Sequence, residues 1–244
     1  MKCYIGFDDT DTLHSDLGTG KYARYFAQSI QADFPVTGVV RQQFPQLPDI
    51  PFTTHNSSAC VIVEVESTAD VDRLRKAAVG HIQNYFQDGS DPGLCLACET
   101  DRCADIENFG RLCSSRIVSQ DEAYAIARPI HLSGHGGTND GIIGALAGVG
   151  LTMSGWGGSF IDFGDIRSLP PEIPIGELRR RGIEPVAAIR KGLVPHDDQY
   201  VDTSYGIRPR LWGGRPVLLL LQKDDFNWIP SDRRKKGPFV QDPK

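Results

Sequence analysis

The sequence of 244 residues lacks any apolar run long enough to cross a lipid bilayer. It also lacks a signal-peptide pattern, because the N-terminus leads directly into a strand-like apolar segment. We therefore expect a cytoplasmic protein with no membrane partner. No internal repeat or low-complexity tract occurs. Hydrophobic residues make up 40% and charged residues 23%, which is ordinary for a globular protein with a real core.

An excess of positive charge is missing as well. The formal net charge of −5 argues against a broad surface that coats nucleic acid. The concentrated basic run, Arg233 to Lys236, is typical of a solvated tail, which we place at residues 231–244. Arg208, Arg210 and Arg215 surround Trp212, and such a group can hold a base or a phosphate or pair with neighbouring acids.

A second CxxC pair is also missing. The six cysteines are Cys3, Cys60, Cys95, Cys98, Cys103 and Cys113. We expect all of them to be reduced in a cytosolic chain. The last four follow the spacing C-x2-C-x4-C-x9-C, which would suit zinc or an iron–sulfur cluster. Alternatively, residues 93–98 form a strand and Cys95 and Cys98 face opposite sides. We favour the strand, because the spacing fits no common structural zinc pattern.

The most informative stretch covers residues 3–21 and reads CYIGFDDTDTLHSDLGTGK. Its apolar start predicts a short buried strand, after which Asp8, Asp9 and Asp11 follow closely. Crowded carboxylates repel one another unless a cation lies between them, and Mg²⁺ prefers oxygen ligands. These three aspartates therefore predict a Mg²⁺ site. The alternative is that they form only Asx-turns and a helix cap.

The same stretch ends in glycines that precede a helical pattern. Backbone N–H groups at Gly18 and Gly20, together with Lys21, would bind an anion at the helix N-terminus. A metal on one side and an anion on the other predict a nucleotide phosphate between them. A Walker A loop is excluded, because no glycine lies five residues before Gly20 and Tyr22 follows the lysine.

A second glycine-rich stretch covers residues 131–151 and reads HLSGHGGTNDGIIGALAGVGL. It predicts a loop followed by a helix of small residues that can approach another backbone closely. Thr138 or Asn139 would cap this helix and create a second anion site. His135 would contact phosphate or act as a general acid or base. The proline-rich segment 44–56 either presents Asn56 to a ligand or is only a rigid connection.

The remaining periodicity predicts an α/β (α+β) fold with mixed β-sheets flanked by helices. We expect further strands at residues 36–41, 59–66, 159–163, 183–189 and 215–222. We expect helices at residues 69–86, with Ser67 or Thr68 as the cap, at 104–112 and at 121–128.

Four pieces of the sequence resemble one family. IGFDDTD at residues 5–11 resembles the GIDDTDS opening of the archaeal tRNA-isoleucine agmatidine synthetase (TiaS) family. LPDIPFTT at residues 47–54 is similar to that family's NPNIPxKT segment, DPG at 91–93 to its NPG turn, and GIIGALA at 141–147 to its GIIGAIAA helix. The pieces occur in the family's order across residues 4 to about 150.

The resemblance implies a kinase-like core with a ferredoxin-like lobe, which we assign to residues 1–230 as one or two packed lobes. It implies that Asp8, Asp9 and Asp11 hold Mg²⁺ and ATP, and that Thr19 takes part in phosphoryl transfer. The family modifies a tRNA. The cysteine pairs of the family's zinc ribbon are missing after residue 150, so the acceptor is either RNA, a nucleotide or a small molecule.

We therefore expect a Mg²⁺-dependent, ATP-using phosphotransferase with Asp9, Thr19 and His135 as catalytic residues. Gly18, Gly20, Lys21, Asn56 and Asn139 would bind the nucleotide. One alternative is a DxD-type phosphatase built on Asp9 and Asp11. The others are a non-catalytic module that binds a nucleotide or RNA through the arginine group, and a cysteine-ligated metal or redox protein.

Overall fold

The computed structural model describes residues 1–47, 55–189 and 192–232. The chain folds into two compact units, Met1–Gly158 and Ser159–Lys244. Except for Leu47, the TiaS-like segment at residues 47–54 lies outside the described residues, and so does the basic run at 233–236. Within the described ranges, no helix is both long enough and apolar enough to span a membrane.

The first unit begins with a β-α-β-β-α-β arrangement. Its elements are β1 (Lys2–Asp8), α1 (Thr19–Ile30), β2 (Val36–Gln43), β3 (Ser57–Glu64), α2 (Thr68–Tyr85) and β4 (Gly93–Cys98). The strands pair antiparallel in the order β4-β1-β3-β2. This is the ferredoxin-like topology. The α/β class and the ferredoxin-like lobe expected from the sequence are therefore confirmed.

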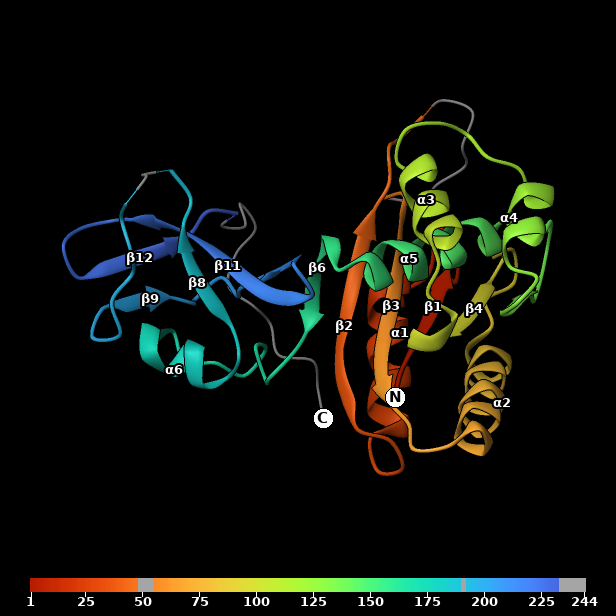
Figure 1. Cartoon of the computed structure of the whole chain (residues 1–244), viewed down its shortest axis with the longest axis horizontal. Coiled ribbons are helices and arrows are strands. Elements are labelled where there is room, and N and C mark those ends of the chain that lie inside the picture. Colours follow the sequence, from red (N-terminus) through yellow and green to blue (C-terminus); the bar gives the residue numbers. More distant parts are fainter. Residues whose placement is uncertain (48–54, 190–191, 233–244) are drawn as a thin grey trace. The chain divides into compact units, whose positions relative to one another are not determined.

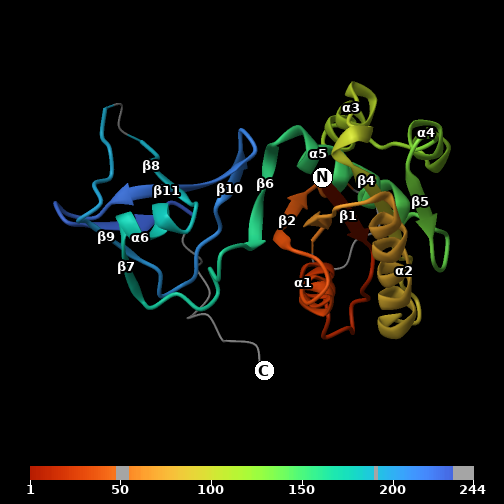
Figure 2. The same cartoon turned by 60° about the horizontal axis from the view of Figure 1, so that its bottom comes forward.

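Further elements follow β4, and two of their helices cover the second face of this sheet. They are η1 (Glu99–Asp101), α3 (Ala104–Cys113), α4 (Gln120–Ile126), β5 (His131–Gly134), α5 (Gly141–Ser154) and β6 (Trp156–Asp162). Strand β5 pairs with the free edge of β4. Figures 1 and 2 show α3 and α5 on one face of β1 to β3 and α1 on the other.

Alternation along β1 explains the two faces. The Phe7 ring packs edge-on against Tyr22 and Phe26 of α1, with ring centroids 5.4 and 5.1 Å apart. The intervening Gly6 faces α5, where a Cβ atom would lie 2.4 Å from the Ala145 carbonyl oxygen. Only glycine permits this approach. The predicted close contact of α5 with another backbone is thus confirmed.

The expected helix caps are partly right. Ser67 caps α2 in a reciprocal arrangement with Asp70, as the sequence predicts. The prediction that Thr138 or Asn139 caps α5 is wrong, because the N-cap position is Asp140 and makes no side-chain cap bond. Thr138 is instead bound to Asp91.

Among its described residues, the second unit contains six short strands and one short helix besides the end of β6. They are β7 (Glu172–Pro174), α6 (Ile175–Arg180), β8 (Glu184–Ala187), β9 (Tyr200–Asp202), β10 (Arg210–Trp212), β11 (Arg215–Gln222) and β12 (Asn227–Pro230). Strand β11 pairs parallel with β8 and antiparallel with β10 and β12. A separate core forms around the fully buried Trp228, Ile175 and Leu220.

Candidate functional site: an acidic cavity at the end of the first strand

The site begins where β1 ends. Asp8 is the last residue of the strand, and Asp9 adopts a left-handed backbone conformation with φ of 50°. This conformation is uncommon for residues other than glycine and costs free energy, although aspartate tolerates it better than most. The chain therefore turns sharply at the first carboxylates, and residues 9–18 lead back to the start of α1.

This turn is tied to the first residue of α1. Thr19 donates from its backbone N–H and from Oγ1 to Asp11 Oδ1, at 3.1 and 2.9 Å. The hydroxyl of Thr10 donates to Thr19 Oγ1 at 3.2 Å, and both threonines are buried. Asp11 consequently serves the helix start, which is what the alternative of a turn and cap predicts for this residue. Asp8 and Asp9 are not explained in that way.

A cavity of about 340 Å³ lies beside the turn. Five aspartates from three segments of the chain line it, together with aromatic, apolar and polar groups. The lining consists of Asp8, Asp9, Asp11, Thr19, Phe44, His55, Asn56, Ser57, Asp91, Cys113, Arg116, Ile117, Val118, Asp140, Gly141, Ile143 and Gly144. The cavity is therefore acidic, with an apolar wall from the α3–α4 segment and from α5.

The pKa values of the Asp8 and Asp9 carboxyl groups are both raised above the ordinary value of 3.8. Burial, and then the neighbouring charge of Asp9, raise the pKa of Asp8 to about 8. Burial, followed by the charges of Asp91, Asp11 and Asp140, raises the pKa of Asp9 to about 6. Like charges around a partly buried space disfavour ionisation, and a bound cation would relieve this cost.

The other two aspartates of the cavity have protein partners. Asp91 accepts hydrogen bonds from Thr138, at 2.8 Å from the backbone N–H and at 2.7 Å from the hydroxyl. Asp140 accepts one from Gln120 Nε2 at 2.6 Å. The Thr138 bonds hold the loop before α5 against the turn before β4, and the Gln120 bond ties the same loop to α4. Both acidic groups are thereby fixed at the cavity.

Glycines of α5 allow this helix to approach the acidic turn. A Cβ atom at Gly144 would lie 1.7 Å from Asp8 Oδ2. One at Gly141 would lie 2.1 Å from the Asp91 carbonyl oxygen and 2.6 Å from the Gly93 nitrogen. The glycines of α5 therefore allow this helix to contact both the turn at Asp8 and the turn at Asp91.

No ready-made metal centre exists among the described residues, since no three His, Cys, Asp or Glu side chains converge closely enough to hold an ion. The chemistry of the donor set nevertheless fits a hard divalent cation, because carboxylate oxygens of raised pKa face a shared cavity. The predicted Mg²⁺ ligands Asp8, Asp9 and Asp11 all belong to this lining.

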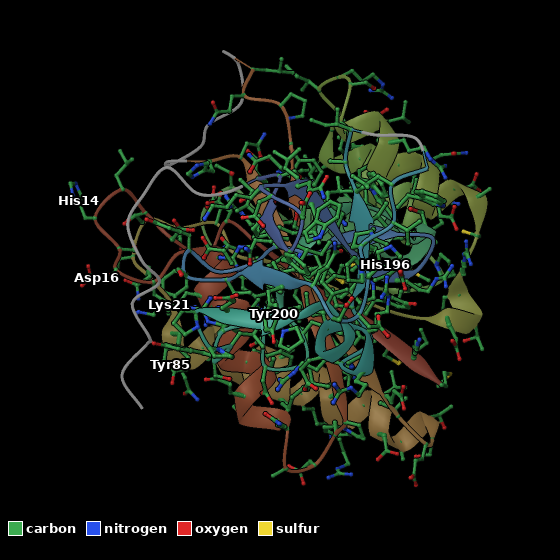
Figure 3. All side chains as sticks on the ribbon, turned by 90° about the vertical axis from the view of Figure 1, so that its left-hand side faces the viewer. His14, Asp16, Lys21, Tyr85, His196 and Tyr200 are labelled. Atoms are coloured by element: carbon green, nitrogen blue, oxygen red, sulfur yellow. A yellow bond between two sulfur atoms is a disulfide. The ribbon has the colours of Figure 1, made fainter. Side chains whose placement is uncertain are left out.

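Gly18, Gly20 and Lys21, the predicted phosphate cradle, are not among the lining residues. Gly18 is the N-cap of α1, and the Lys21 ammonium lies 5.5 Å from the centroid of the Tyr25 ring. Figure 3 shows Lys21 on the same margin of the first unit as His14 and Asp16, whose side chains point outward. Thr19, between the two glycines, is the residue of this helix start that lines the cavity, and its backbone N–H donates to Asp11.

His135 and Asn139 also lie outside the lining. The His135 and His131 rings each share a hydrogen bond with the Ser133 hydroxyl, at 2.8 and 3.0 Å. Asn139 adopts a φ of 66° and lies against Gly134, where a Cβ atom would be 2.2 Å from its Oδ1. His135 therefore lies in a row with Ser133 and His131 along β5. Asp140, which follows Asn139 in the sequence, lines the cavity.

Of the predicted residues, Asn56 and Thr19 do line the cavity. The loop from His135 to Asp140 is expected to face this cleft, but sequence reasoning assigned Asp140 no role of its own, and it missed Asp91 and Arg116. Signals existed for the two aspartates, because each lies within or directly beside a segment that carries the family resemblance. Arg116 offered no such signal, because it lies in a short connection between α3 and α4 with no motif around it.

The cysteines do not form a metal site among the described residues. The prediction that all six are reduced is wrong in this structure, because Cys3 and Cys98 form a disulfide between directly paired positions of β1 and β4. Cys95 and Cys98 lie on one strand, as the alternative predicted. Cys95 and Cys113 are buried, whereas Cys103 is exposed. The cysteine-ligated alternative therefore has no support in the described part of the chain.

The arginine group is engaged in ordinary contacts. Arg208 Nη1 donates to the Ile161 carbonyl oxygen at 3.4 Å. Arg210 Nη2 lies 3.9 Å from Asp232 Oδ2, within ion-pair distance. Trp212 and Arg215 are paired residues of the hairpin formed by β10 and β11. The pairing of arginine with a neighbouring acid, one of the two outcomes expected for this group, is observed at Arg210.

These observations define a class, a ferredoxin-like α/β unit with an acidic cavity at the end of its first strand. No family model and no curated protein matches the chain. Solved structures do match. A complex of TiaS with an isoleucine tRNA and ATP matches with 24% identity and a TM-score of 0.53, over 62% of this chain and 36% of that chain.

Two further structures give the same result. A tRNA fluorescent labelling enzyme matches with 24% identity and a TM-score of 0.50, over 62% of this chain and 36% of that chain. A complex of TiaS with the isoleucine tRNA, AMPCPP and agmatine also gives 24% identity and a TM-score of 0.50, over 61% and 36%. The chain therefore has a partial TiaS-like fold, and spans about a third of the length of the chains it matches.

Proposed function

We propose that this chain is a Mg²⁺-dependent, ATP-using phosphotransferase. The observation that carries the proposal is the convergence of five aspartates on one cavity, where burial and neighbouring carboxylates raise the pKa values of Asp8 and Asp9. The fold supports it, because the matched TiaS structures hold ATP or an ATP analogue together with tRNA. The acceptor is accordingly an RNA, a nucleotide or a small molecule.

Asp8 and Asp9 would hold the metal ion, because their carboxylates face the cavity with raised pKa values and Asp11 already serves Thr19. Bound there, Mg²⁺ would neutralise phosphate charge and orient the transferred group. The wall of Phe44, Val118 and Ile143 offers apolar surface for the nucleobase or for the acceptor.

Thr19 is the group in the cavity best placed to take part in transfer. Its hydroxyl already donates to Asp11 Oδ1 at 2.9 Å, so this carboxylate can accept the proton when Thr19 Oγ1 bonds to the γ-phosphorus and the bond to ADP breaks. In a second step the acceptor oxygen would bond to the same phosphorus, the bond to Thr19 Oγ1 would break, and Asp11 would return the proton to Thr19. Asn56 would serve the site by position, because it lines the cavity while its Nδ2 donates to the Pro45 carbonyl oxygen at 2.8 Å.

The test is thermal unfolding of the wild-type chain with ATP, with and without Mg²⁺. A ligand at a hundred times its dissociation constant adds about 2.7 kcal/mol of stability. We expect this stabilisation to require both ATP and Mg²⁺ and to disappear in Asp9→Asn. Asp72→Asn is the matched control, because Asp72 is an exposed aspartate of α2 paired with Arg75.

An unchanged response in Asp9→Asn would overturn the proposal. Phosphate release from simple esters without ATP would favour the DxD-type phosphatase instead. Nucleotide or RNA binding that does not depend on Mg²⁺ and is lost on replacing Arg210 and Arg215 would favour the non-catalytic binding module.

A further inference from the structure

Arg116 is the arginine of the acidic cavity, and no lysine accompanies it in the described lining. It lies in the connection that follows α3, on the wall that also presents Ile117 and Val118. Every other charged residue of that lining is an aspartate, apart from His55, which is ionisable. A cavity built to hold an anion together with a cation needs a positive group on the anion's side, and Arg116 is the candidate among the described residues.

Two hydrogen bonds hold the Arg116 guanidinium in place. Its Nη1 donates to the Ile117 carbonyl oxygen at 2.9 Å, and its Nη2 donates to Glu122 Oε1 at 2.7 Å. Glu122 is itself fixed, because its Oε2 accepts from the Ser119 backbone N–H at 2.9 Å in the reciprocal cap of α4. The helix cap therefore anchors the arginine.

Position and exposure suit a ligand contact. Asp8, Cys113 and Arg116 all line the same cavity. The Arg116 side chain is 46% exposed. A guanidinium carries five N–H donors, so a group that gives one to Glu122 and one to Ile117 retains others for phosphate oxygens.

The ion pair alone does not explain the arrangement. An exposed pair between arginine and glutamate adds little stability. Arg111 and Glu107 on α3 form such a pair at 3.1 Å without lining the cavity. The two arginines differ in position, because Arg116 lines the cavity together with five aspartates and Arg111 does not.

We propose that Arg116 binds the terminal phosphates of a nucleoside triphosphate and that Glu122 positions it. This inference rests on the proposed function and deepens it, because it assigns the polyphosphate, rather than the base or the ribose, as the part of the nucleotide that this wall recognises. Asp8 and Asp9 then face the phosphates from one side through a divalent ion, and Arg116 faces them directly from the other.

The test measures the dissociation constants of ATP, AMP and inorganic triphosphate, with Mg²⁺, for the full chain and its variants by titration calorimetry. Charge-assisted hydrogen bonds to phosphate predict that Arg116→Ala weakens ATP and triphosphate binding about 10- to 100-fold. AMP binding should change less than about threefold. Arg116→Lys should recover only part of the loss, because lysine lacks the planar fork. Arg111→Ala is the control and should bind all three like the wild type.

Glu122→Gln separates positioning from helix capping. Glutamine still caps α4 in this arrangement, so the unfolding midpoint should stay near the wild-type value. The guanidinium keeps its charge but loses its anchor, so ATP binding should weaken, although by less than in Arg116→Ala. A loss as large as that of Arg116→Ala, or no loss, would refute the positioning role of Glu122.

The outcomes distinguish a failure of the Arg116 proposal from a failure of the proposed function. If the wild type binds Mg²⁺ and ATP but Arg116→Ala binds ATP equally well, the role of Arg116 is wrong and the proposed function stands. Equal losses for ATP and AMP would also refute it, because they would show a general disturbance of the cavity. If the wild type binds neither ATP nor triphosphate, both proposals fail.

Discussion

Replacement of Asp8 by asparagine should make the protein more stable at neutral pH. The pKa of the Asp8 carboxyl is raised from 3.8 to about 8, first by burial and then by the charge of Asp9. The native state therefore retains a proton that the unfolded state releases. It follows that this group lowers the free energy of unfolding progressively as the pH rises from about 4 to about 8.

The magnitude follows from the size of the shift. One pKa unit corresponds to about 1.36 kcal/mol, and about three units separate the ordinary value from pH 7, which gives an upper limit of about 4 kcal/mol. Asp8 keeps part of its surface exposed to the cavity, so solvent reduces the cost. We expect Asp8→Asn to raise the free energy of unfolding by about 2 kcal/mol at pH 7.

Urea unfolding over a pH series measures this effect as the difference between variant and wild type, so that all other titrating groups largely cancel. The difference should be near zero at pH 4 and grow up to pH 8. Excess Mg²⁺ should stabilise the wild type at pH 8 more than the variant, because the asparagine side chain is a weaker cation ligand. Asp72→Asn, on the exposed face of α2, should show no such growth.

A difference that stays constant with pH would refute the reasoning. So would an Asp8→Asn variant less stable than the wild type at pH 8, because either result would mean that the carboxylate is compensated in the native state. In that case the acidic cavity would carry no unrelieved charge, and the main support for a cation there would be lost.

Two further predictions concern packing and covalent structure. Gly144→Ala should destabilise the fold by about 1–3 kcal/mol and abolish the Mg²⁺-ATP response, because the new methyl group would displace the Asp8 carboxylate. Gly80→Ala in α2, where a Cβ atom meets nothing within 4 Å, should stabilise the protein by about 0.5–1 kcal/mol; equal effects at both sites would contradict the close approach of α5. Thiol titration of the denatured chain should count four reactive cysteines before reduction and all six after it, and six before reduction would exclude the Cys3–Cys98 disulfide.

Local patterns account for much that the sequence predicted correctly. The apolar start of the chain gives β1, and the serine before residues 68–85 gives the cap of α2. The acidic turn is visible because aspartates directly follow an apolar strand. The small residues of α5 predict a close contact with another backbone, and the structure shows that this backbone is β1. Each of these features is decided within a few residues along the chain.

Where a local rule failed, another part of the chain had bound the group in question. Lys21 follows a glycine-rich helix start, yet it does not line the cavity, and the Thr19 backbone N–H at this start donates to Asp11. Thr138 does not cap α5, because Asp91 binds it from the turn before β4. Cys98 belongs to a run of cysteines, yet its partner is Cys3 on the neighbouring strand. None of these partners could be recognised from spacing alone.

The chain by itself therefore determined the class of fold, the order of its first elements and the aspartates that follow the first strand. The tertiary structure decided which other groups join them. Strand pairing and the approach of α5 bring Asp91, Asp140 and Arg116 to one cavity from positions far apart in the sequence. The physical reason is that secondary structure depends on neighbours along the chain, whereas a site depends on which faces of those elements pack together.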